Sequence, residues 1–211
     1  MTVLDRPTVS FDREGDLRAL ASARRDRVRF VQPPMARFLA IDGNDVPGSP
    51  EYLQAIGTLY RAAYRLHYML RARGARAKVG MLEALYWLPD DALETNGATT
   101  AAELVEWRWR LLVSVPDEAT EDDVDAACRE VKPDPMVGRL FLDRRAEGPC
   151  AQILHVGPYG DEGPALRRLH EAIARAGLRP TGPLHEIYLN DPSRVGEERA
   201  RTVVRRAVEA A

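Results

Sequence analysis

The chain has 211 residues, of which 45% are hydrophobic and 29% charged, and its formal net charge is -2. This length is enough for one sizeable core or two small fused ones. Because the charge is balanced, we expect no general attraction for phosphate backbones and no nucleic-acid partner. No apolar run approaches the roughly 18 residues of a membrane span, and the N-terminus lacks a secretory pattern, so we expect a cytoplasmic protein and no membrane partner.

The motifs of common cofactor and metal sites are absent from the sequence. Cys128 and Cys150 make no disulfide framework, and we expect them to be free thiols. No spacing of histidines, cysteines and carboxylates matches a zinc site, and there is no Walker loop or dinucleotide fingerprint. We therefore expect no metal and no cofactor.

The N-terminal part is polar and leads into a first strand. Residues 1–34 are rich in arginine and are treated as an N-terminal extension, with room for a short helix within residues 16–27. Residues 36–45 have a short apolar core closed by a Gly-Asn-Asp turn, which predicts a strand.

Residues 49–74 carry the clearest helix signals in the chain. Ser49 can cap the helix and Pro50 fits its first turn. Gly74 can end the helix in a left-handed conformation. The sequence therefore predicts a long helix directly after the first strand.

Two strands and a second helix follow. Residues 78–88 and 105–115 are predicted as strands, and the second of them alternates tryptophan with arginine. Residues 119–131 are predicted as a helix because Thr120 and Asp123 have the spacing of a capping box.

The second half of the chain begins with a predicted antiparallel pair of strands at 137–145 and 150–157. A helix closed by Gly177 and a strand at 182–190 follow. The last segment has strong helix propensity, but completing the sheet requires a strand, and we predict one at about 201–208.

The two halves share the order strand, helix, strand, strand, which indicates an internal duplication. Repeat one spans about 36–115 and repeat two about 137–208, with the helix at 119–131 as a linker between them. We therefore expect an α+β fold in which residues 35–211 form one domain of two βαββ units.

A glutamate inside a predicted strand, Glu186, is the first sign of a functional site. In a strand, Glu186 and Tyr188 share one face, while Ile187 and Leu189 share the other and suit packing beneath helices. The face that carries Glu186 is then either ordinary solvent-exposed surface or the floor of a pocket.

Glu83 raises the same question in repeat one, because it also lies in the strand after the helix. If the two glutamates are equivalent, they approach one groove, and their repulsion raises the pKa of at least one of them. The pieces GMLEALYW and GPLHEIYL leave the register of this equivalence open by one residue.

Aromatic residues are concentrated in repeat one, where they either pack in the core or line a ligand pocket. Tyr60 and Tyr64 are four residues apart on the predicted helix. Trp87, Trp107 and Trp109 lie on or beside the strands. Together with carboxylates, aromatic rings form boxes for flat or cationic ligands. His155 ends a strand at a glycine turn, where it either orients a neighbour or bonds the backbone.

Several stretches together resemble the stand-alone proteins of the GyrI-like family, which carry the GyrI-like small-molecule-binding domain. The matching stretches cover roughly residues 30–210 and include FLAIDG, MLEALYW, EWRWRLLV, QILHVGPYGDE and HEIYLNDP. The resemblance implies duplicated βαββ (SHS2-type) units that form antiparallel sheets, with helices on one face and a ligand groove on the other. Met81, Ala84 and Tyr86 depart from the family pattern, so we expect a pocket of different shape.

The resemblance also implies a function, since stand-alone members include hydrolases of cyclopropanoid, DNA-alkylating spirocyclopropyl compounds. It implies that Glu186, with Glu83, activates water, while Tyr188 or Tyr64 binds a conjugated carbonyl. The expected ligand contacts are Tyr60, Tyr64, Trp87, Trp107, Trp109, His155 and Tyr159. We expect a detoxification enzyme that is a monomer or weak homodimer.

Two other functions fit the same resemblance. The first is a non-catalytic binder of aromatic or cationic drugs, because in related multidrug-responsive regulators the glutamate at the position of Glu186 meets cationic drugs in an aromatic pocket. The second is an inhibitor of gyrase, for which the acidic run 117–125 would have to imitate DNA; a solvated helix N-terminus explains this run better.

Overall fold

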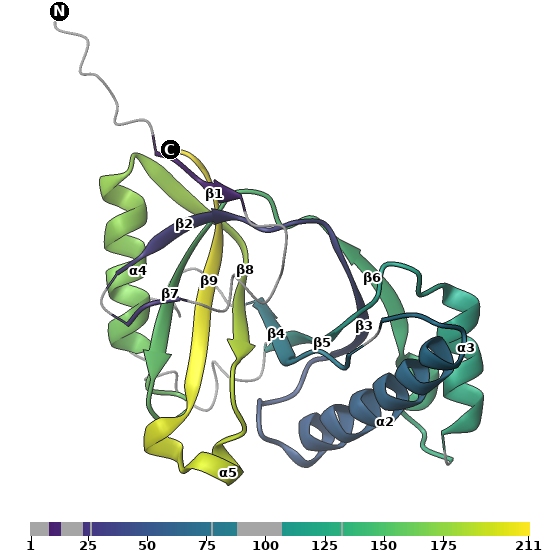
Figure 1. The fold of residues 1–211 in the computed structure, drawn as a ribbon. Coiled ribbons are helices and arrows are strands. Elements are labelled where there is room, and N and C mark those ends of the chain that lie inside the picture. Colours follow the sequence, from purple (N-terminus) through teal and green to yellow (C-terminus); the bar gives the residue numbers. More distant parts are fainter. Residues whose placement is uncertain (1–8, 14–22, 26, 77, 88–106, 132) are drawn as a thin grey trace, which may run out of the picture. The chain divides into compact units, whose positions relative to one another are not determined.

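The computed structural model is α+β and divides into two compact units, which are described separately (Figure 1). It describes residues 9–13, 23–25, 27–76, 78–87, 107–131 and 133–211. The strands are β1 (Asp12–Arg13), β2 (Arg29–Gln32), β3 (Ala36–Gly43), β4 (Leu82–Trp87), β5 (Arg108–Val115), β6 (Phe141–Arg145), β7 (Cys150–Val156), β8 (Leu178–Tyr188) and β9 (Arg201–Ala210). The helices are α2 (Pro50–Ala72), α3 (Glu121–Glu130), α4 (Gly163–Arg175) and α5 (Pro192–Val195), with 3-10 turns at Val137–Arg139 and Glu197–Arg199.

The repeat-one unit comprises the described residues of 35–88 and 99–146, and the repeat-two unit comprises those of 1–34 and 147–211. In the repeat-one unit β5 pairs antiparallel with both β3 and β4. In the repeat-two unit β9 pairs antiparallel with both β7 and β8. Each unit therefore has a helix between its first two strands and its third strand in the middle, which confirms the duplicated βαββ fold.

The helix boundaries follow the predicted capping residues. The Ser49 hydroxyl accepts the backbone N–H of Tyr52, and Pro50 occupies the first turn of α2. Thr120 and Asp123 form the predicted capping box of α3. Both caps satisfy backbone N–H groups that have no partner within the helix.

The strand predicted at the C-terminus is confirmed as β9, which pairs along its length with β7 and β8. Five consecutive residues of β9, from Thr202 to Arg206, are buried, so packing on both sides of the sheet outweighs the helix propensity of the segment.

Two predictions of the strand order differ from the structure. β6 pairs with β3 at the edge of the repeat-one sheet, so the predicted hairpin of β6 with β7 is wrong. β7 instead pairs with β2, which comes from the segment treated as an N-terminal extension. Most of the short helix expected within residues 16–27 lies outside the described residues.

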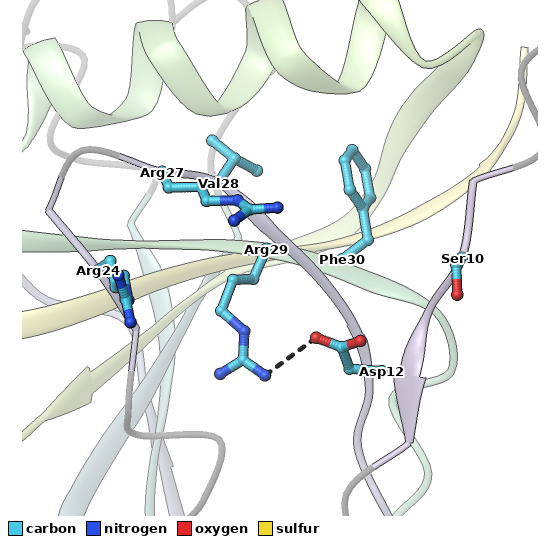
Figure 2. A pocket seen from close by; sticks show the side chains of 7 residues that line it. All are labelled: Ser10, Asp12, Arg24, Arg27, Val28, Arg29 and Phe30. Atoms are coloured by element: carbon cyan, nitrogen blue, oxygen red, sulfur yellow. Dashed lines mark hydrogen bonds and ion pairs between the residues drawn. The ribbon is translucent and has the colours of Figure 1, made fainter.

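The repeat-two sheet has distinguishable faces. Figure 2 shows Phe30 of β2 pointing toward the side of the sheet along which a helix runs, while Arg29 points to the opposite side. The register places Ala151 of β7 beside Phe30, and Ile153, two residues further along, beside Val204 of β9. The buried residues Ala151, Ile153 and Val204 therefore lie on the face covered by α4.

Among the described helices, none combines the length and the apolar character needed to cross a membrane.

Candidate functional site

Glu186 and Tyr188 lie on one face of β8 and contact each other. The Tyr188 hydroxyl donates to Oε2 of Glu186 over 2.8 Å. Residues two apart on a strand share a face, so the contact is built into the local sequence EIY. Both side chains are half-buried.

The face that carries Glu186 is the helix face of the repeat-two sheet. Glu186 lies opposite Val204, which lies opposite Ile153 on that face. The expectation that Ile187 and Leu189 pack beneath the helix, with Glu186 on the far side, is therefore wrong.

Glu162, at the N-terminus of α4, is a site residue that the sequence analysis missed. Glu162 is only 7% exposed, and its Oε2 accepts a hydrogen bond from the Gly160 N–H over 2.8 Å. Oε1 is buried and has no hydrogen-bond partner among the described residues. The available signal in the sequence was an acidic residue directly before a helix that follows a strand.

His155 and Thr202 complete this cluster. The register places Thr202 of β9 directly between His155 of β7 and Tyr188 of β8. His155 Nε2 lies 3.1 Å from the carbonyl oxygen of Pro158, a contact in which the ring N–H donates. The Thr202 hydroxyl is buried and has no hydrogen-bond partner in the described part of the chain. Two orphaned polar atoms thus lie in one cluster, and such atoms mark a place for water or ligand.

Tyr159 adds an aromatic ring to the same site. Its ring centroid lies 5.2 Å from that of Tyr188 in an edge-to-face arrangement, and Tyr159 is 46% exposed. Edge-to-face packing leaves one exposed ring available for a flat ligand. The structure therefore brings together four of the predicted site residues, namely Glu186, Tyr188, His155 and Tyr159.

The electrostatics of the cluster favour protonated carboxyl groups. Burial raises the pKa of Glu186 to about 8, the charge of Glu162 adds to this, and the Tyr188 hydrogen bond and His185 oppose it. Burial also raises the pKa of Glu162, against the Gly160 N–H and the attraction of His155. Shifted carboxyl groups of this kind cluster at functional sites.

Glu83 is not the counterpart of Glu186. Glu83 pairs with Leu112 on β5, whereas Ala84 pairs with Leu111. The two strands can be aligned on their tyrosines, because Tyr86 and Tyr188 each end the same Gly-x-Leu-x-x-x-Tyr pattern. Ala84 therefore stands where Glu186 stands, and the predicted equivalence is wrong by one residue. A one-residue slip moves a side chain to the other face of the sheet.

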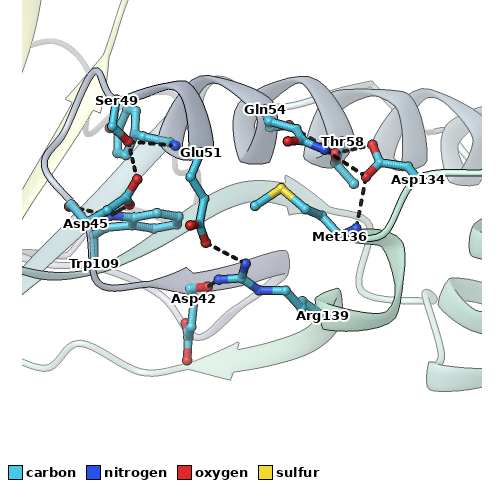
Figure 3. Close-up of polar contacts among 11 residues, drawn as sticks. Asp42, Asp45, Ser49, Glu51, Gln54, Thr58, Trp109, Asp134, Met136 and Arg139 are labelled. Atoms are coloured by element: carbon cyan, nitrogen blue, oxygen red, sulfur yellow. Dashed lines mark hydrogen bonds and ion pairs between the residues drawn. The ribbon is translucent and has the colours of Figure 1, made fainter.

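Trp109 belongs to the core of the repeat-one unit. It is 1% exposed, and its indole N–H donates to the carbonyl oxygen of Asp45 at 3.0 Å and to its Oδ1 at 2.9 Å (Figure 3). Tyr52 of α2 packs against it edge to face. With its ring surrounded and its N–H occupied, Trp109 cannot serve as a stacking platform, which corrects its predicted role.

The same row of residues differs between the two units. The rows across the three strands are Gly43–Trp109–Tyr86 in the repeat-one unit and His155–Thr202–Tyr188 in the repeat-two unit. A Cβ at Gly43 would lie 2.1 Å from the Trp109 ring, so glycine is required there. The third residue of the helix is Tyr52 in α2 and Ala165 in α4. In repeat one, aromatic side chains thus fill the space between the sheet and the helix. In repeat two, small and polar side chains stand at the matching positions and leave part of that space open.

The other predicted aromatics lie in the repeat-one unit. Trp87 is half-buried, with Arg108 and Arg110 at 5.8 and 5.9 Å from its ring centroid. Trp107 packs edge to face on Tyr86. Tyr60 and Tyr64 lie with ring centroids 6.2 Å apart on α2. The role of Tyr60, Tyr64, Trp87 and Trp107 as ligand contacts stays a prediction.

The chemistry of the site is that of carboxyl groups and aromatic rings. Within the described ranges there is no group of three or more His, Cys, Asp or Glu residues arranged to hold a metal ion. Cys150 is buried, and burial raises the pKa of its thiol well above the usual range, so it is a poor nucleophile.

Comparison with known proteins identifies relatives over nearly the whole chain. A family model described as the GyrI-like small molecule binding domain matches residues 114–205. The crystal structure of an uncharacterized conserved protein from Listeria innocua is similar with a TM-score of 0.80 and 30% identity, covering 92% of this chain and 97% of that one. A search of curated protein sequences finds no match.

Two further similar structures are those of hydrolases from Listeria innocua. The first has a TM-score of 0.75 and 25% identity, and covers 95% of this chain and 100% of the hydrolase. The second has a TM-score of 0.73 and 26% identity, and covers 94% of this chain and 100% of the hydrolase.

Proposed function

Because the chain belongs to the family of proteins with a GyrI-like small-molecule-binding domain, we propose that its repeat-two unit binds an electrophilic aromatic compound at Glu186 and hydrolyses it. The observation that carries this proposal is the half-buried Glu186 carboxyl, bonded to Tyr188 and beside the buried Glu162. The similarity to two Listeria hydrolases supports hydrolysis as the reaction class.

The substrate class that we propose is the cyclopropanoid group of DNA-alkylating compounds, in which a spirocyclopropyl ring is conjugated to a carbonyl. Their planar ring system would stack on Tyr159, whose ring is partly exposed. Glu186 would activate a water molecule that opens the cyclopropane, and Tyr188 would hold the carboxyl in place. Ring opening restores aromaticity, so modest assistance suffices, and the product can no longer alkylate DNA.

The first experiment incubates the purified protein with a spirocyclopropyl DNA alkylator and follows the ring-opened product by chromatography. Loss of a general base lowers rates by roughly 10²–10⁴-fold, which is the loss expected for Glu186→Gln. Glu171→Gln, the same chemical change at an exposed position of α4, is the control and should keep wild-type turnover.

The alternative is that the protein binds aromatic or cationic drugs without transforming them. Two neighbouring carboxyl groups would also suit such binding. Saturable binding without product from the wild-type protein would establish this alternative and exclude the hydrolase. Turnover by Glu186→Gln at the wild-type rate would remove Glu186 from the mechanism.

Inhibition of gyrase is the third possibility, and the structure offers it little support. Asp123, in the middle of the acidic run 117–125, is buried and committed to the capping box of α3 and to Arg73, whose Nη2 lies 2.6 Å from its Oδ1. Much of the run therefore serves the start of a helix.

A further inference from the structure

Glu162 carries an unused hydrogen-bonding atom at the site of Glu186. Its Oε2 is held by the Gly160 N–H at 2.8 Å, which fixes the direction of the carboxyl group. Its Oε1 is buried without a partner among the described residues, in a residue only 7% exposed. A buried carboxyl oxygen without a partner destabilises the folded protein, so a proton, water molecule or ligand is expected there.

Glu186 is held in a similar way. Its Oε2 accepts the Tyr188 hydroxyl, and no arginine or lysine forms an ion pair with Glu186 or Glu162 within the ranges that the structure describes. The turn before α4 brings the two carboxyl groups together, because Tyr159 packs on Tyr188, which bonds Glu186, and the next residue, Gly160, bonds Glu162. Two weakly solvated carboxylates without a cation repel each other, and this repulsion is relieved when the pair binds one proton.

The groups that surround the pair come from each neighbouring element. β7 contributes His155, and the turn before α4 contributes Asp161, whose charge opposes ionisation of Glu162. β8 contributes Tyr188, which favours ionised Glu186, and His185 on the opposite face of β8 acts in the same direction. β9 contributes the Thr202 hydroxyl and, further along the same face, Arg206. Both carboxyl groups keep a raised pKa in these surroundings.

We propose that Glu162 and Glu186 share one proton and act as a donor and acceptor pair, so that one carboxyl protonates the ligand while the other accepts a proton from water. This inference rests on the proposed function and adds Glu162 to it. A single carboxylate base would leave the developing oxyanion of the substrate without a proton donor other than tyrosine.

The proton balance of the reaction fits such a pair. The protonated carboxyl gives its proton to the carbonyl oxygen of the substrate. The cyclopropane C–C bond breaks, and its electron pair enters the ring, which becomes a phenol. The water oxygen bonds to the released carbon, and the proton of this water moves to the ionised carboxyl. The net reaction is the addition of one water molecule, and the pair again holds one proton.

The pair also predicts what the site prefers to bind. With one proton, it offers one donor and one acceptor and carries one negative charge instead of two. A neutral ligand with a carbonyl group matches this arrangement, because the carbonyl accepts the shared proton. A ligand with a fixed positive charge but no hydrogen-bond donor or acceptor would interact only with the negative charge of the pair.

The test is a titration of the glutamate carboxyl carbons by NMR, with ¹³C-labelled protein and no ligand. In the wild type, we expect one carboxyl of the pair to titrate near neutral pH. In Glu162→Gln, whose amide oxygen can still accept the Gly160 N–H, the pKa of Glu186 should fall by about one unit or more because the repulsion is gone. Glu171→Gln should leave it unchanged.

The pH dependence of turnover gives a second readout. In the wild type, kcat/KM should be bell-shaped, since the pair works only with one proton bound. Glu162→Gln should remove one limb of the bell and lower the rate near neutral pH by at least about tenfold. A merely structural role for Glu162 would lower the rate equally at every pH.

The outcomes separate the pair from the proposed function. If the wild type shows no turnover but Glu186 titrates near neutral pH and responds to Glu162→Gln, the pair stands and hydrolysis falls. If both carboxyls titrate below about pH 5 in the wild type, the shared proton is excluded even where turnover is found. The wild-type titration decides this also if Glu162→Gln fails to fold.

Discussion

A single carboxyl group, Glu186, links the stability of the protein to pH. Its pKa is raised to about 8 in the folded protein, mainly by burial, whereas an unfolded chain has the ordinary value near 4.3. The folded state therefore keeps the proton longer than the unfolded state does. The stabilising contribution of the protonated group is present below the unfolded pKa and is lost as pH rises through the folded pKa.

This sign predicts that Glu186→Gln gains stability relative to the wild type as pH rises. We expect the difference in free energy of unfolding to change by on the order of 2 kcal/mol between pH 5 and pH 8, because glutamine stays neutral. Thermal unfolding across this range measures it. A difference that stays constant with pH, as expected for the exposed control Glu171→Gln, would contradict the raised pKa.

Gly43 shows how one residue makes room for another. A Cβ at this position would lie 2.1 Å from the Trp109 ring, and Tyr52 packs edge to face against the same ring. We expect Gly43→Ala to destabilise the protein by about 1–3 kcal/mol through overpacking. Urea unfolding measures the loss, and Gly138→Ala is the matched control, since a Cβ at Gly138 meets nothing within 4 Å.

The residues of the site were predictable in part. Glu186 and Tyr188 stood out because a carboxyl inside an apolar strand is unusual, and the pattern of alternation placed them on one face. Glu162 did not stand out, because its role depends on its position beside Glu186 of β8, a contact between elements that the sequence alone does not display. The equivalence of Glu83 and Glu186 failed because the side-chain period of a strand is two, so an ambiguity of one residue reverses the face.

The strands of the repeat-two sheet carry a buried charged network on the face opposite to α4. Arg205 of β9 donates to Oε1 of Gln152 from Nε at 3.0 Å and from Nη2 at 2.8 Å. Its Nη1 donates to Glu147 at 3.0 Å, and His185 lies 3.0 Å from the other oxygen of Glu147. Because Arg205 and His185 are almost fully buried, the network depends on each of its partners.

Breaking this network should be costly and dependent on pH. Burial alone would raise the pKa of Glu147, but the attraction of His185 and Arg205 outweighs it and holds the pKa well below its usual range. The stabilisation is then present above the unfolded pKa and is lost as pH falls. We expect Glu147→Gln to cost about 3–5 kcal/mol near pH 7 and progressively less below about pH 4.5.

Chemical unfolding between pH 3 and pH 8 tests this expectation. The matched control is Glu209→Gln on β9, which removes one member of an exposed ion pair with Arg179 and should cost at most about 1 kcal/mol. An equal cost for Glu147→Gln and Glu209→Gln at pH 7 would show that the buried network contributes little.

The strands and helices with local sequence signals were predicted well, but the pairing of the strands was not. Ser49, Thr120 and Asp123 mark helix starts by contacts within a few residues, so the sequence displays them. The pairing of β6 with β3 depends on residues about 100 positions apart, as Phe141 with Ala40 shows. Neither strand carries a local mark of its partner, and the nearer strand β7 was chosen in error.

The duplication explains why, among the described residues, the carboxyl cluster lies in the repeat-two unit. Both units have the same strand order. In each unit, the tyrosine of the second strand pairs with one residue of the third strand, which is Trp109 in repeat one and Thr202 in repeat two. In repeat one the row holds an indole that packs on Tyr52, and in repeat two it holds the hydroxyl of Thr202. The row is thus part of the core in repeat one, whereas in repeat two it carries the Thr202 hydroxyl, which has no hydrogen-bond partner among the described residues.

The difference between the two rows predicts that the core arrangement of repeat one can be transferred to repeat two. Thr202→Trp alone should destabilise the protein by about 1–3 kcal/mol, because His155 stands where repeat one has glycine. Adding His155→Gly opens that space, so the double variant should lose at least about 0.5 kcal/mol less than the sum of the single changes. The indole should also occupy the site and abolish ligand binding.

Free energies of unfolding for the wild type, both single variants and the double variant form a double-mutant cycle that measures this coupling. Binding of the spirocyclopropyl compound is measured on the same four proteins. His155→Gly alone should keep binding measurable, since it adds no bulk, and the double variant should show none. Additive losses, or a double variant that binds as the wild type does, would mean that the two rows are alike in register but not in the space that they fill.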